Sequence, residues 1–346
     1  MEITLLIAIL ISFVLTIIFI PRWIKNCKRV ELLWEDMNKF GHPRNVASSG
    51  GIVVVMAFIM GVLSYIAIRT FIFKDADGIN VKIFALLTVI LILAIVGLTD
   101  DLLGWKHGGL SAWFRVLLAL VAAIPLVVIN VGYNVGYYNN ISLPFLGSIN
   151  IGILYILILI PIGIAGATTT YNMLAGFNGL EAGMGIIMLS FLSFIAYVTC
   201  YPWLALIGLC MVAALIGFYF YNKYPAKVFP GDILTYSVGA LIAIMAILGN
   251  FKTIAVFIYI PYIIETILKS RGKLKKQSFG IPQKDGSIKL PYEKIYGFTH
   301  LSIFILSKFK KKVYERDVVY LIYLVEIIIC LLALLIFKNS IFIQIC

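Results

Sequence analysis

The sequence predicts an all-α, polytopic membrane protein with about ten transmembrane helices, and its composition and apolar runs support this fold class. Of the 346 residues, 62% are hydrophobic and 13% are charged, whereas a soluble domain carries roughly a quarter charged residues. Apolar runs of about twenty residues recur along the chain, and each can cross a hydrocarbon layer of about 30 Å as a helix. A membrane β-barrel would instead alternate polar and apolar residues in strands of about ten. We therefore expect residues 1–346 to form a single integral membrane domain.

The expected spans follow one another through short connections, except for one long loop near the C-terminal end. The first apolar run lacks a basic n-region and a small-residue cleavage site, so we expect a retained span and not a signal peptide. Very short turns at 200–203 and 249–252 predict two helical hairpins. The spans are expected at residues 2–21, 49–69, 82–99, 113–131, 151–170, 183–200, 202–222, 233–249, 252–268 and 318–337.

The distribution of basic residues predicts the orientation in the membrane. The chain has 28 Lys and Arg and a net charge of +12, which in a soluble protein would suggest nucleic acid as a partner. Membrane proteins, however, accumulate Lys and Arg in their cytoplasmic loops. We therefore expect a cytoplasmic side, both termini on the external side, and the bilayer as a partner in place of nucleic acid. The loops on this side hold 23 of the 28 basic residues and are 22–48, 99–115, 171–182, 223–232 and 269–317.

The first polar segment of interest is TDDLLGWKHGG from Thr99, where a span is expected to end in the adjacent carboxylates Asp100 and Asp101. Two ionised neighbours at a membrane boundary repel each other and are costly there, so they require cations or a function. Solvated aspartates at a helix end are the alternative interpretation.

Two further segments follow. NMLAGFNGLEAG begins at Asn172 and places two asparagines, a glutamate and several glycines after the fifth span. Asparagine oxygens are neutral ligands, and glycines let the backbone approach a bound molecule; a flexible interhelical loop is the alternative. VFPGDIL begins at Val228 and places Asp232 at the start of the eighth span, where a helix N-cap is the alternative to a ligand role.

These segments together predict a magnesium site for a phosphorylated substrate. Three carboxylates and two asparagines reach one membrane face, beside the strongly basic loop 269–317. Mg²⁺ takes oxygen ligands and keeps waters and substrate phosphates in its shell. The basic loop is expected to bind the phosphorylated substrate, with attraction to anionic lipid as the alternative. The sequence contains no HExxH, zinc-ligand spacing or Walker A motif.

The paired aspartates, the NGLEAG stretch and the Gly-Asp of the eighth span occur in an order that resembles the polyprenyl-phosphate N-acetylhexosamine-1-phosphate transferases. The resemblance covers almost the whole chain and is strongest to the eukaryotic and archaeal UDP-GlcNAc:dolichyl-phosphate GlcNAc-1-phosphate transferases. It implies transfer of GlcNAc-1-phosphate from the UDP-sugar to dolichyl phosphate with release of UMP, as the first step of N-glycan assembly. It also implies an archaeal cell membrane, or the endoplasmic reticulum if the chain is eukaryotic. Whether the chain forms a homodimer is left open by the sequence.

The resemblance assigns individual residues to the site. Asn172 and Asp232 match ligands of Mg²⁺, with Mn²⁺ as an alternative ion. Asp100 and Asp101 are the catalytic candidates, expected to orient the lipid phosphate, with a covalent aspartyl-phosphate as the alternative. The expected substrate-binding residues are Asp36, Met37, Arg115, Gly176, Asn178, Glu181 and Phe229.

Within that set, the resemblance implies distinct contacts. Gly176 and Phe229 are expected to sandwich the uracil ring, while Asn178 hydrogen-bonds its edge. Asp36 and Met37 are expected at the nucleoside. Arg115 is expected at the pyrophosphate; it matches only if a short insertion follows the aspartate pair, and it stands where relatives usually carry lysine, which has a different donor geometry.

Two departures from the family pattern leave the donor sugar open. Val46-Ala47 stands where the family has Pro-Glu. Ser278-Phe279-Gly280 stands where relatives carry Arg-His-Arg, in a segment that helps to recognise the sugar and the pyrophosphate. Another UDP-HexNAc donor is therefore an alternative within the same family.

A multispan transporter is the alternative from another class of protein. Transporters place ionisable residues near the bilayer midplane. Here Glu265 and Glu326 lie within predicted spans, and both are expected near span ends. That position favours an enzyme with its site at the membrane surface, and its lipid substrate is expected to enter through a groove between spans.

Overall fold

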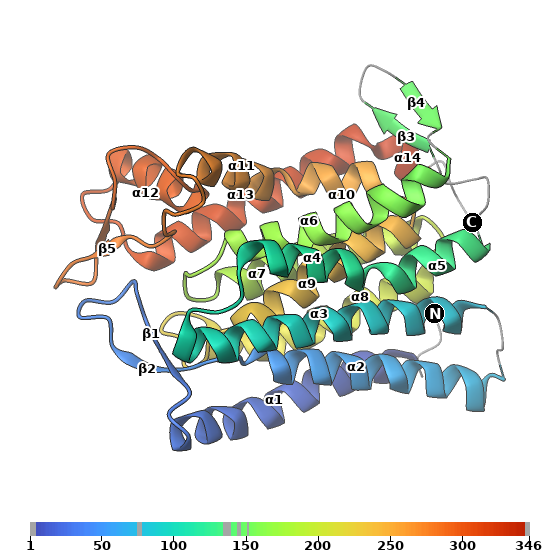
Figure 1. Cartoon of the computed structure of the whole chain (residues 1–346), viewed down its shortest axis with the longest axis horizontal. Coiled ribbons are helices and arrows are strands. Elements are labelled where there is room, and N and C mark those ends of the chain that lie inside the picture. The colour runs from blue at the N-terminus through green and yellow to red at the C-terminus, as the bar shows by residue number, and fades with distance from the viewer. Residues whose placement is uncertain (1–4, 75–77, 134–139, 144–146, 151, 343–346) are drawn as a thin grey trace.

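The computed structural model describes residues 5–74, 78–133, 140–143, 147–150 and 152–342, which form a helical bundle (Figure 1). The α-helices are α1 (Leu6–Arg29), α2 (Gly51–Ala67), α3 (Ile79–His107), α4 (Ala112–Ala122), α5 (Ile124–Tyr133), α6 (Ile160–Met173), α7 (Leu180–Val198), α8 (Pro202–Asn222), α9 (Gly231–Leu248), α10 (Lys252–Ile258), α11 (Ile260–Arg271), α12 (Phe298–Phe309), α13 (Glu315–Ile336) and α14 (Lys338–Phe342). Two π-helical segments, Ile68–Ile72 and Tyr155–Leu159, adjoin α2 and α6. Three antiparallel pairs are formed by β1 (Leu33–Glu35) with β2 (Arg44–Ala47), β3 (Asn140–Leu143) with β4 (Gly147–Asn150), and β5 (Ile281–Pro282) with β6 (Ile288–Lys289).

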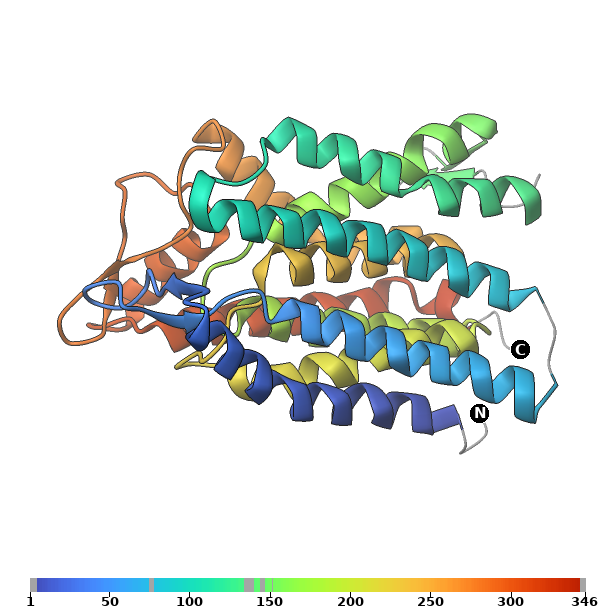
Figure 2. The ribbon, with the colours of Figure 1, turned by 60° about the horizontal axis from the view of Figure 1, so that its bottom comes forward.

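The long helices run side by side along one axis in both views (Figures 1 and 2). Within the described residues, nine helical segments are long and apolar enough to cross a membrane, and α10 with α11 makes a tenth if the bent pair is one span. Each coincides with one predicted span, so the prediction of an all-α polytopic protein is confirmed. The tenth bends by 57° between α10 and α11, where Pro261 lies in the first turn of α11 and cannot continue the hydrogen bonding of the preceding helix.

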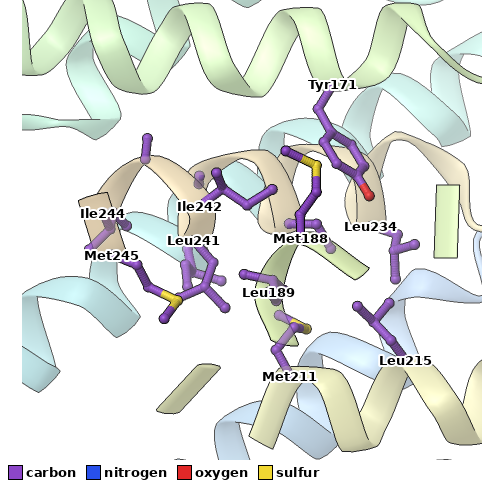
Figure 3. Packing of buried hydrophobic residues seen from close by; sticks show 14 of the residues in the cluster. Tyr171, Met188, Leu189, Met211, Leu215, Leu234, Leu241, Ile242, Ile244 and Met245 are labelled. Carbon is purple, nitrogen blue, oxygen red and sulfur yellow. The ribbon is translucent and has the colours of Figure 1, made fainter. Parts of the chain in front are cut away.

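Helix α9 lies at the centre of the bundle, where it packs against α3 on one side and α6 on another. Its side chains are apolar nearly all round, as expected of a helix enclosed by others, and several appear in the packed core of Figure 3. Glycines set how closely the backbones approach. A Cβ at Gly97 of α3 would lie 2.6 Å from the backbone of Asp232, and one at Gly239 would lie 2.7 Å from the carbonyl oxygen of Ala167. Small residues at such contacts let membrane helices approach, and this contact fixes Asp232 against α3.

The aspartate pair does not end its helix, so that expectation was wrong. Helix α3 continues to His107 and stops where Gly108 adopts a left-handed conformation with φ of +84°, a common helix terminator. Asp100 and Asp101 therefore belong to a regular helix, and their side chains point in fixed, different directions.

The segment 269–317 is folded and not an open loop. It contains the β5–β6 pair and the helix α12, which at about 18 Å is too short to cross the membrane. Helix α12 packs against α11 and α13. The carboxylate of Glu265 on α11 accepts a hydrogen bond from the backbone N–H of Phe298, the first residue of α12. Helix α12 is thereby fixed to the end of the bundle.

The loops that were expected on one side do lie together. β1, β2, β5 and α12 occupy the left end of the bundle in Figure 1, while α1 begins and α14 lies at the opposite end. The first and last described helices thus have their outer ends on the same side. The membrane side on which each end lies remains a prediction from the basic residues.

The expectation that Glu326 lies near a span end was wrong. Glu326 is midway along α13 and has no exposed surface. Cys330, one turn further, contacts its carboxylate with a sulfur–oxygen distance of 3.8 Å. It faces the interior of the bundle, as ionisable groups within membrane helices usually do. Its position therefore no longer argues against a transporter.

Candidate active site

A pocket of about 340 Å³ opens among α3, α4, α6 and α9 and the loops at that end of the bundle. Within the described parts of the chain, every residue predicted for the site except Asp36 and Asn178 lines it. These lining residues are Met37, Asp100, Asp101, Arg115, Asn172, Gly176, Glu181, Phe229 and Asp232. Segments separated by more than a hundred residues in sequence therefore meet at one cavity.

The centre of the pocket is a guanidinium between two carboxylates. Arg115 lies in the first turn of α4, whose N-cap is Ser111. Its Nη1 atom is 2.6 Å from Oδ2 of Asp100 and 3.4 Å from Oδ2 of Asp232. The backbone N–H of Leu110, in the turn after α3, donates to the other oxygen of Asp100. Both carboxylates therefore face the positively charged guanidinium of Arg115, which is held between them.

Asp101 has a different environment from its neighbour. Its Oδ1 accepts a hydrogen bond of 2.7 Å from the backbone N–H of Asp232, and its Oδ2 is 3.5 Å from the backbone nitrogen of Ile233. These are N–H groups at the start of α9, which have no partner within their own helix. Asp101 thus caps α9 from the neighbouring helix. The N-cap role weighed for Asp232 belongs to Asp101, which leaves the Asp232 side chain free to face the pocket.

Asn172 is held beside the same helix end. The hydroxyl of Thr235, one turn after Asp232, lies 3.2 Å from Oδ1 of Asn172 and donates to the backbone oxygen of Asp232 at 3.1 Å. Thr235 also lines the pocket. The end of α6 and the start of α9 are tied together at the pair of residues expected to bind the metal.

This donor set fits a magnesium ion that also binds a substrate phosphate. Asp100 and Asp232 share the guanidinium of Arg115, and Asp101 lies beside them at the start of α9. Among the described residues that line the pocket, Arg115 is the only Lys or Arg near these three carboxylates. In the part of the chain that the structure describes, no three His, Cys, Asp or Glu residues form a self-sufficient metal cluster. Mg²⁺ does not need one, because it commonly uses one or two carboxylates and completes its shell with waters and phosphate oxygens.

The other wall of the pocket is the loop between α6 and α7. Gly176 has φ of +103°, and its backbone N–H donates to Oε1 of Glu181 at 2.7 Å. The ring of Phe279 covers its free face, because a Cβ on Gly176 would lie 2.5 Å from that ring. Phe279 lines the pocket but was not among the predicted binding residues. The sequence did contain a signal for Phe279, because it lies in Ser278-Phe279-Gly280, the segment that departs from the family pattern.

Phe229 is positioned by a strand from the first loop. Its backbone N–H donates to the carbonyl of Ala47 at 2.8 Å, and the N–H of Ala47 is 3.3 Å from the carbonyl of Lys227. Ala47 is fully buried and also pairs with Leu33 in β1. At Val46-Ala47, where the family pattern has Pro-Glu, this chain therefore has a buried strand without the family's carboxylate. Glu35, on the partner strand β1, lines the pocket and was missed by the sequence interpretation.

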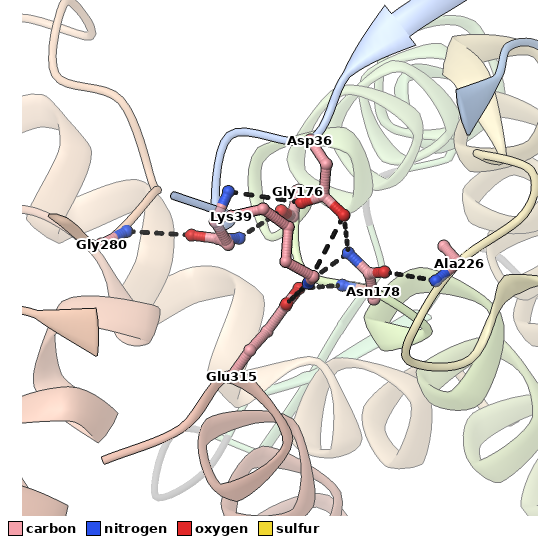
Figure 4. Close-up of polar contacts among 8 residues, drawn as sticks. Asp36, Lys39, Gly176, Asn178, Ala226, Gly280 and Glu315 are labelled. Carbon is pink, nitrogen blue, oxygen red and sulfur yellow. Dashed lines mark hydrogen bonds and ion pairs between the residues drawn. The ribbon is translucent and has the colours of Figure 1, made fainter. Parts of the chain in front are cut away.

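Asp36 and Asn178 lie behind the pocket wall in a buried network (Figure 4). The side-chain amide of Asn178 is 3.2 Å from Asp36 and donates to Glu315 at 2.8 Å. Lys39 pairs with Asp36 and with Glu315. Sequence reasoning missed Lys39 and Glu315, because a glutamate at a helix start gives no signal of a contact so distant in the chain.

Comparison with known proteins finds relatives over nearly the whole chain. The model of the glycosyl transferase family 4 matches residues 83–250, a range that includes both aspartates of α3, Arg115, Asn172 and Asp232. A protein of Saccharolobus solfataricus is 36% identical over 338 residues, covering 97% of this chain and 98% of that protein. One of Sulfolobus acidocaldarius is 33% identical over 330 residues, covering 95% and 94%.

Both archaeal relatives are provisionally named UDP-N-acetylglucosamine–dolichyl-phosphate N-acetylglucosaminephosphotransferases. A protein of Halalkalibacterium halodurans named phospho-N-acetylmuramoyl-pentapeptide-transferase is 28% identical over 286 residues, covering 79% of this chain and 86% of that protein. The resemblance inferred from the motifs is confirmed, and this chain belongs to the glycosyl transferase family 4.

Proposed function

We propose that this chain transfers GlcNAc-1-phosphate from UDP-GlcNAc to dolichyl phosphate, giving a lipid-linked pyrophosphoryl sugar and UMP. The observation that carries the proposal is the convergence of Asp100, Arg115, Asn172 and Asp232 at one pocket. The chain aligns nearly end to end with archaeal proteins named for this reaction.

The reaction forms one bond and breaks one. A phosphate oxygen of the lipid attacks the phosphorus that carries the sugar, and the bond from that phosphorus to the bridging oxygen of UMP breaks. A phosphate monoester with a second pKa of about 6 is already mostly ionised at neutral pH, so the attacking oxygen needs little help from a base. Catalysis then consists mainly of positioning and of neutralising charge.

The residues of the pocket divide this work. Arg115 contacts the pyrophosphate oxygens, and Asp100 fixes the guanidinium from the opposite side. Asn172 and Asp232 would hold Mg²⁺, or Mn²⁺ in its place, which would supply charge neutralisation at the pyrophosphate. Asp101 keeps the first turn of α9 in place through its backbone N–H groups. Met37, Phe229 and the Gly176 loop surround the nucleoside.

A second cavity, of about 660 Å³, is suited to the hydrocarbon chain of the acceptor. It is lined mainly by aliphatic and small residues of α6, α9 and α10. A Cβ at Gly163 or Gly166 would meet nothing within 4 Å, so α6 leaves open space there. Thr170 at one end of this cavity lies two residues before Asn172. An isoprenoid chain held here would have its phosphate end near the metal ligands.

The proposed location is an archaeal cell membrane, with the pocket on the cytoplasmic side. The excess of Lys and Arg in the loops around the pocket supports that orientation, and the two most extensively aligned relatives described above are archaeal. The product would then be the first lipid-linked intermediate of an N-glycan.

The test uses purified protein in lipid nanodiscs with dolichyl phosphate, Mg²⁺ and a panel of UDP-sugars. We expect UMP release and a lipid-linked product with UDP-GlcNAc, and loss of both on adding EDTA, with recovery on excess Mg²⁺ or Mn²⁺. The absence of UMP with every sugar, together with substrate uptake into proteoliposomes, would support a transporter instead.

A second donor sugar is a specific alternative, because Phe279 lines the pocket in place of a polar residue of the family pattern. The same panel distinguishes the two. A higher kcat/KM with another UDP-HexNAc than with UDP-GlcNAc would reassign the donor without changing the reaction class.

A further inference from the structure

Glu315 is a buried carboxylate that the proposed reaction does not use. It is the first residue of α13, only 1% exposed, and it is not among the described residues that line the active-site pocket. Burying a carboxylate is costly unless it is paired and hydrogen-bonded. Its partners therefore indicate what it does.

Two of those partners belong to Asn178. One oxygen of Glu315 accepts the backbone N–H of Asn178 at 2.7 Å and its side-chain amide at 2.8 Å. The side-chain oxygen of Asn178 accepts the backbone N–H of Ala226 at 2.6 Å. Both ends of the Asn178 side chain are thus held by the protein, and Glu315 determines the orientation of the loop two residues after Gly176.

The other oxygen of Glu315 pairs with Lys39 of the first loop (Figure 4). Next to Lys39, the side chain of Asn38 donates to the carbonyl of Gly176 at 2.9 Å and accepts the N–H of Gly280 at 3.1 Å. Gly280 follows Phe279, whose ring covers Gly176. The wall of the pocket therefore depends on a chain of contacts that ends at Glu315.

Helix α13 holds the same loop at a second point. The hydroxyl of Tyr323, about two turns after Glu315, donates to the carbonyl of Gly179. A Cβ at Gly183 would lie 2.0 Å from that hydroxyl, so α7 and α13 are in close contact there. Two side chains of one rigid helix thus fix both ends of the short segment from Asn178 to Gly179.

We propose that Glu315 is a positioning residue for the nucleotide of the donor, acting through Asn178 and Lys39 without touching the substrate. This inference rests on the proposed function, since it assigns the Gly176 loop to a uridine nucleotide. Bonds to an ionised carboxylate are stronger than bonds between neutral groups. A loop fixed before binding loses less conformational entropy when the nucleotide arrives. The carboxylate therefore strengthens binding of the donor and leaves the chemical step and the lipid unaffected.

The test compares E315Q with D317N. Glutamine keeps an oxygen for Asn178 but loses the charge that pairs with Lys39, so folding is expected to persist. Asp317 lies in the same first turn of α13, where it pairs with Lys310 outside the network and accepts the backbone N–H of Tyr314, a bond that the asparagine oxygen can also accept. We expect E315Q to raise the KM for the UDP-sugar and the Kd for UDP about tenfold or more. The kcat and the KM for dolichyl phosphate are expected to change less than about twofold, and D317N is expected to match the unmodified protein.

The outcomes separate this inference from the proposed function. If the unmodified protein neither binds UDP nor releases UMP, the proposed function fails. If it does both and E315Q has the same donor KM, or if kcat and both KM values change together, the positioning role fails. Should E315Q not fold, K39M, whose side chain is partly exposed, tests the same contact. An unchanged donor KM in folded K39M would then overturn the inference.

Discussion

Asp100 accepts a hydrogen bond from the backbone N–H of Leu110, in the turn after α3, and forms an ion pair with Arg115. The guanidinium of Arg115 also contacts Asp232. We expect D100N to lower kcat about a hundredfold or more. The asparagine amide lacks the negative charge of the Asp100 carboxylate, which holds Arg115 in place at the reacting phosphate. UDP binding is expected to remain within about threefold, since Arg115 keeps its charge for the pyrophosphate and the contacts to the nucleoside lie elsewhere in the pocket. UMP release and calorimetric titration with UDP measure the two effects.

The control for D100N is D285N, because Asp285 is an exposed aspartate that pairs with Lys312 away from the pocket. It is expected to behave as the unmodified protein. A phosphorylated Asp100 trapped with UDP-GlcNAc alone would contradict the direct transfer and favour a covalent intermediate.

Phe279 packs on Gly176, and it is held by the segment on each side of it. The hydroxyl of Thr299 donates to the carbonyl of Ser278 at 2.8 Å, and Gly280 donates to Asn38. We expect F279A to raise the donor KM about tenfold, because removal of the ring opens the wall beside the base and lets water enter. F40A is the control, since Phe40 is exposed in the first loop. Equal KM values for the two variants would show that the ring does not contribute to donor binding.

At the scale of secondary-structure elements, the start of α9 is the most constrained point of the site. Gly231 has φ of +73°, and a Cβ there would lie 2.2 Å from Oδ2 of Asp101. We expect G231A to lower the melting temperature and to lower kcat about tenfold or more, because displacing Asp101 moves Asp232 and the metal site. Thermal melting and UMP release measure these effects.

The matched control is G286A, in the turn between β5 and β6. Gly286 has φ of +80°, but a Cβ there would meet nothing within 4 Å. It therefore carries only the strain of the left-handed conformation, about 1–2 kcal/mol. A loss in G286A as large as that in G231A would mean that the contact with Asp101 is unimportant.

The order and number of helices could be predicted from the sequence. An apolar run that crosses the membrane must form a helix, because only internal hydrogen bonds satisfy its backbone N–H and C=O groups there. The ends of those helices could not be predicted. Helix α3 runs past Asp101 to His107, and its end depends on the left-handed Gly108 more than on hydropathy. The helix α12 within segment 269–317 is stabilised by packing on α11 and α13, which a basic composition does not reveal.

At the scale of the whole molecule, the predicted site residues converge because their motifs lie at the ends of spans that face the same side. Asp100, Asn172 and Asp232 could be placed together on that ground alone. The side-chain contacts of the site could not be predicted in this way. Arg115 contacts Asp232 over a sequence separation of 117 residues, and Asn178 contacts Glu315 over one of 137. Such contacts depend on the packing of helices around α9, and no local pattern in one sequence encodes it.

The arrangement of the two cavities predicts that the lipid chain and the nucleotide can be weakened separately. Gly166 lines the larger cavity, and a Cβ there would meet nothing within 4 Å. We expect G166F to raise the KM for dolichyl phosphate about tenfold or more, because the ring occupies volume needed by several buried methylene groups. The KM for UDP-GlcNAc is expected to stay within about twofold, since the nucleotide pocket is separate.

Acceptor length gives the decisive comparison for G166F. A phosphate ester with a chain too short to reach Gly166 is expected to react equally well with G166F and the unmodified protein, and G166A is expected to retain normal use of the long chain. This pattern would place the isoprenoid along α6. If short and long acceptors lose activity to the same extent in G166F, the defect lies in the helix and not in the chain site, and the acceptor must follow another path to Asp100.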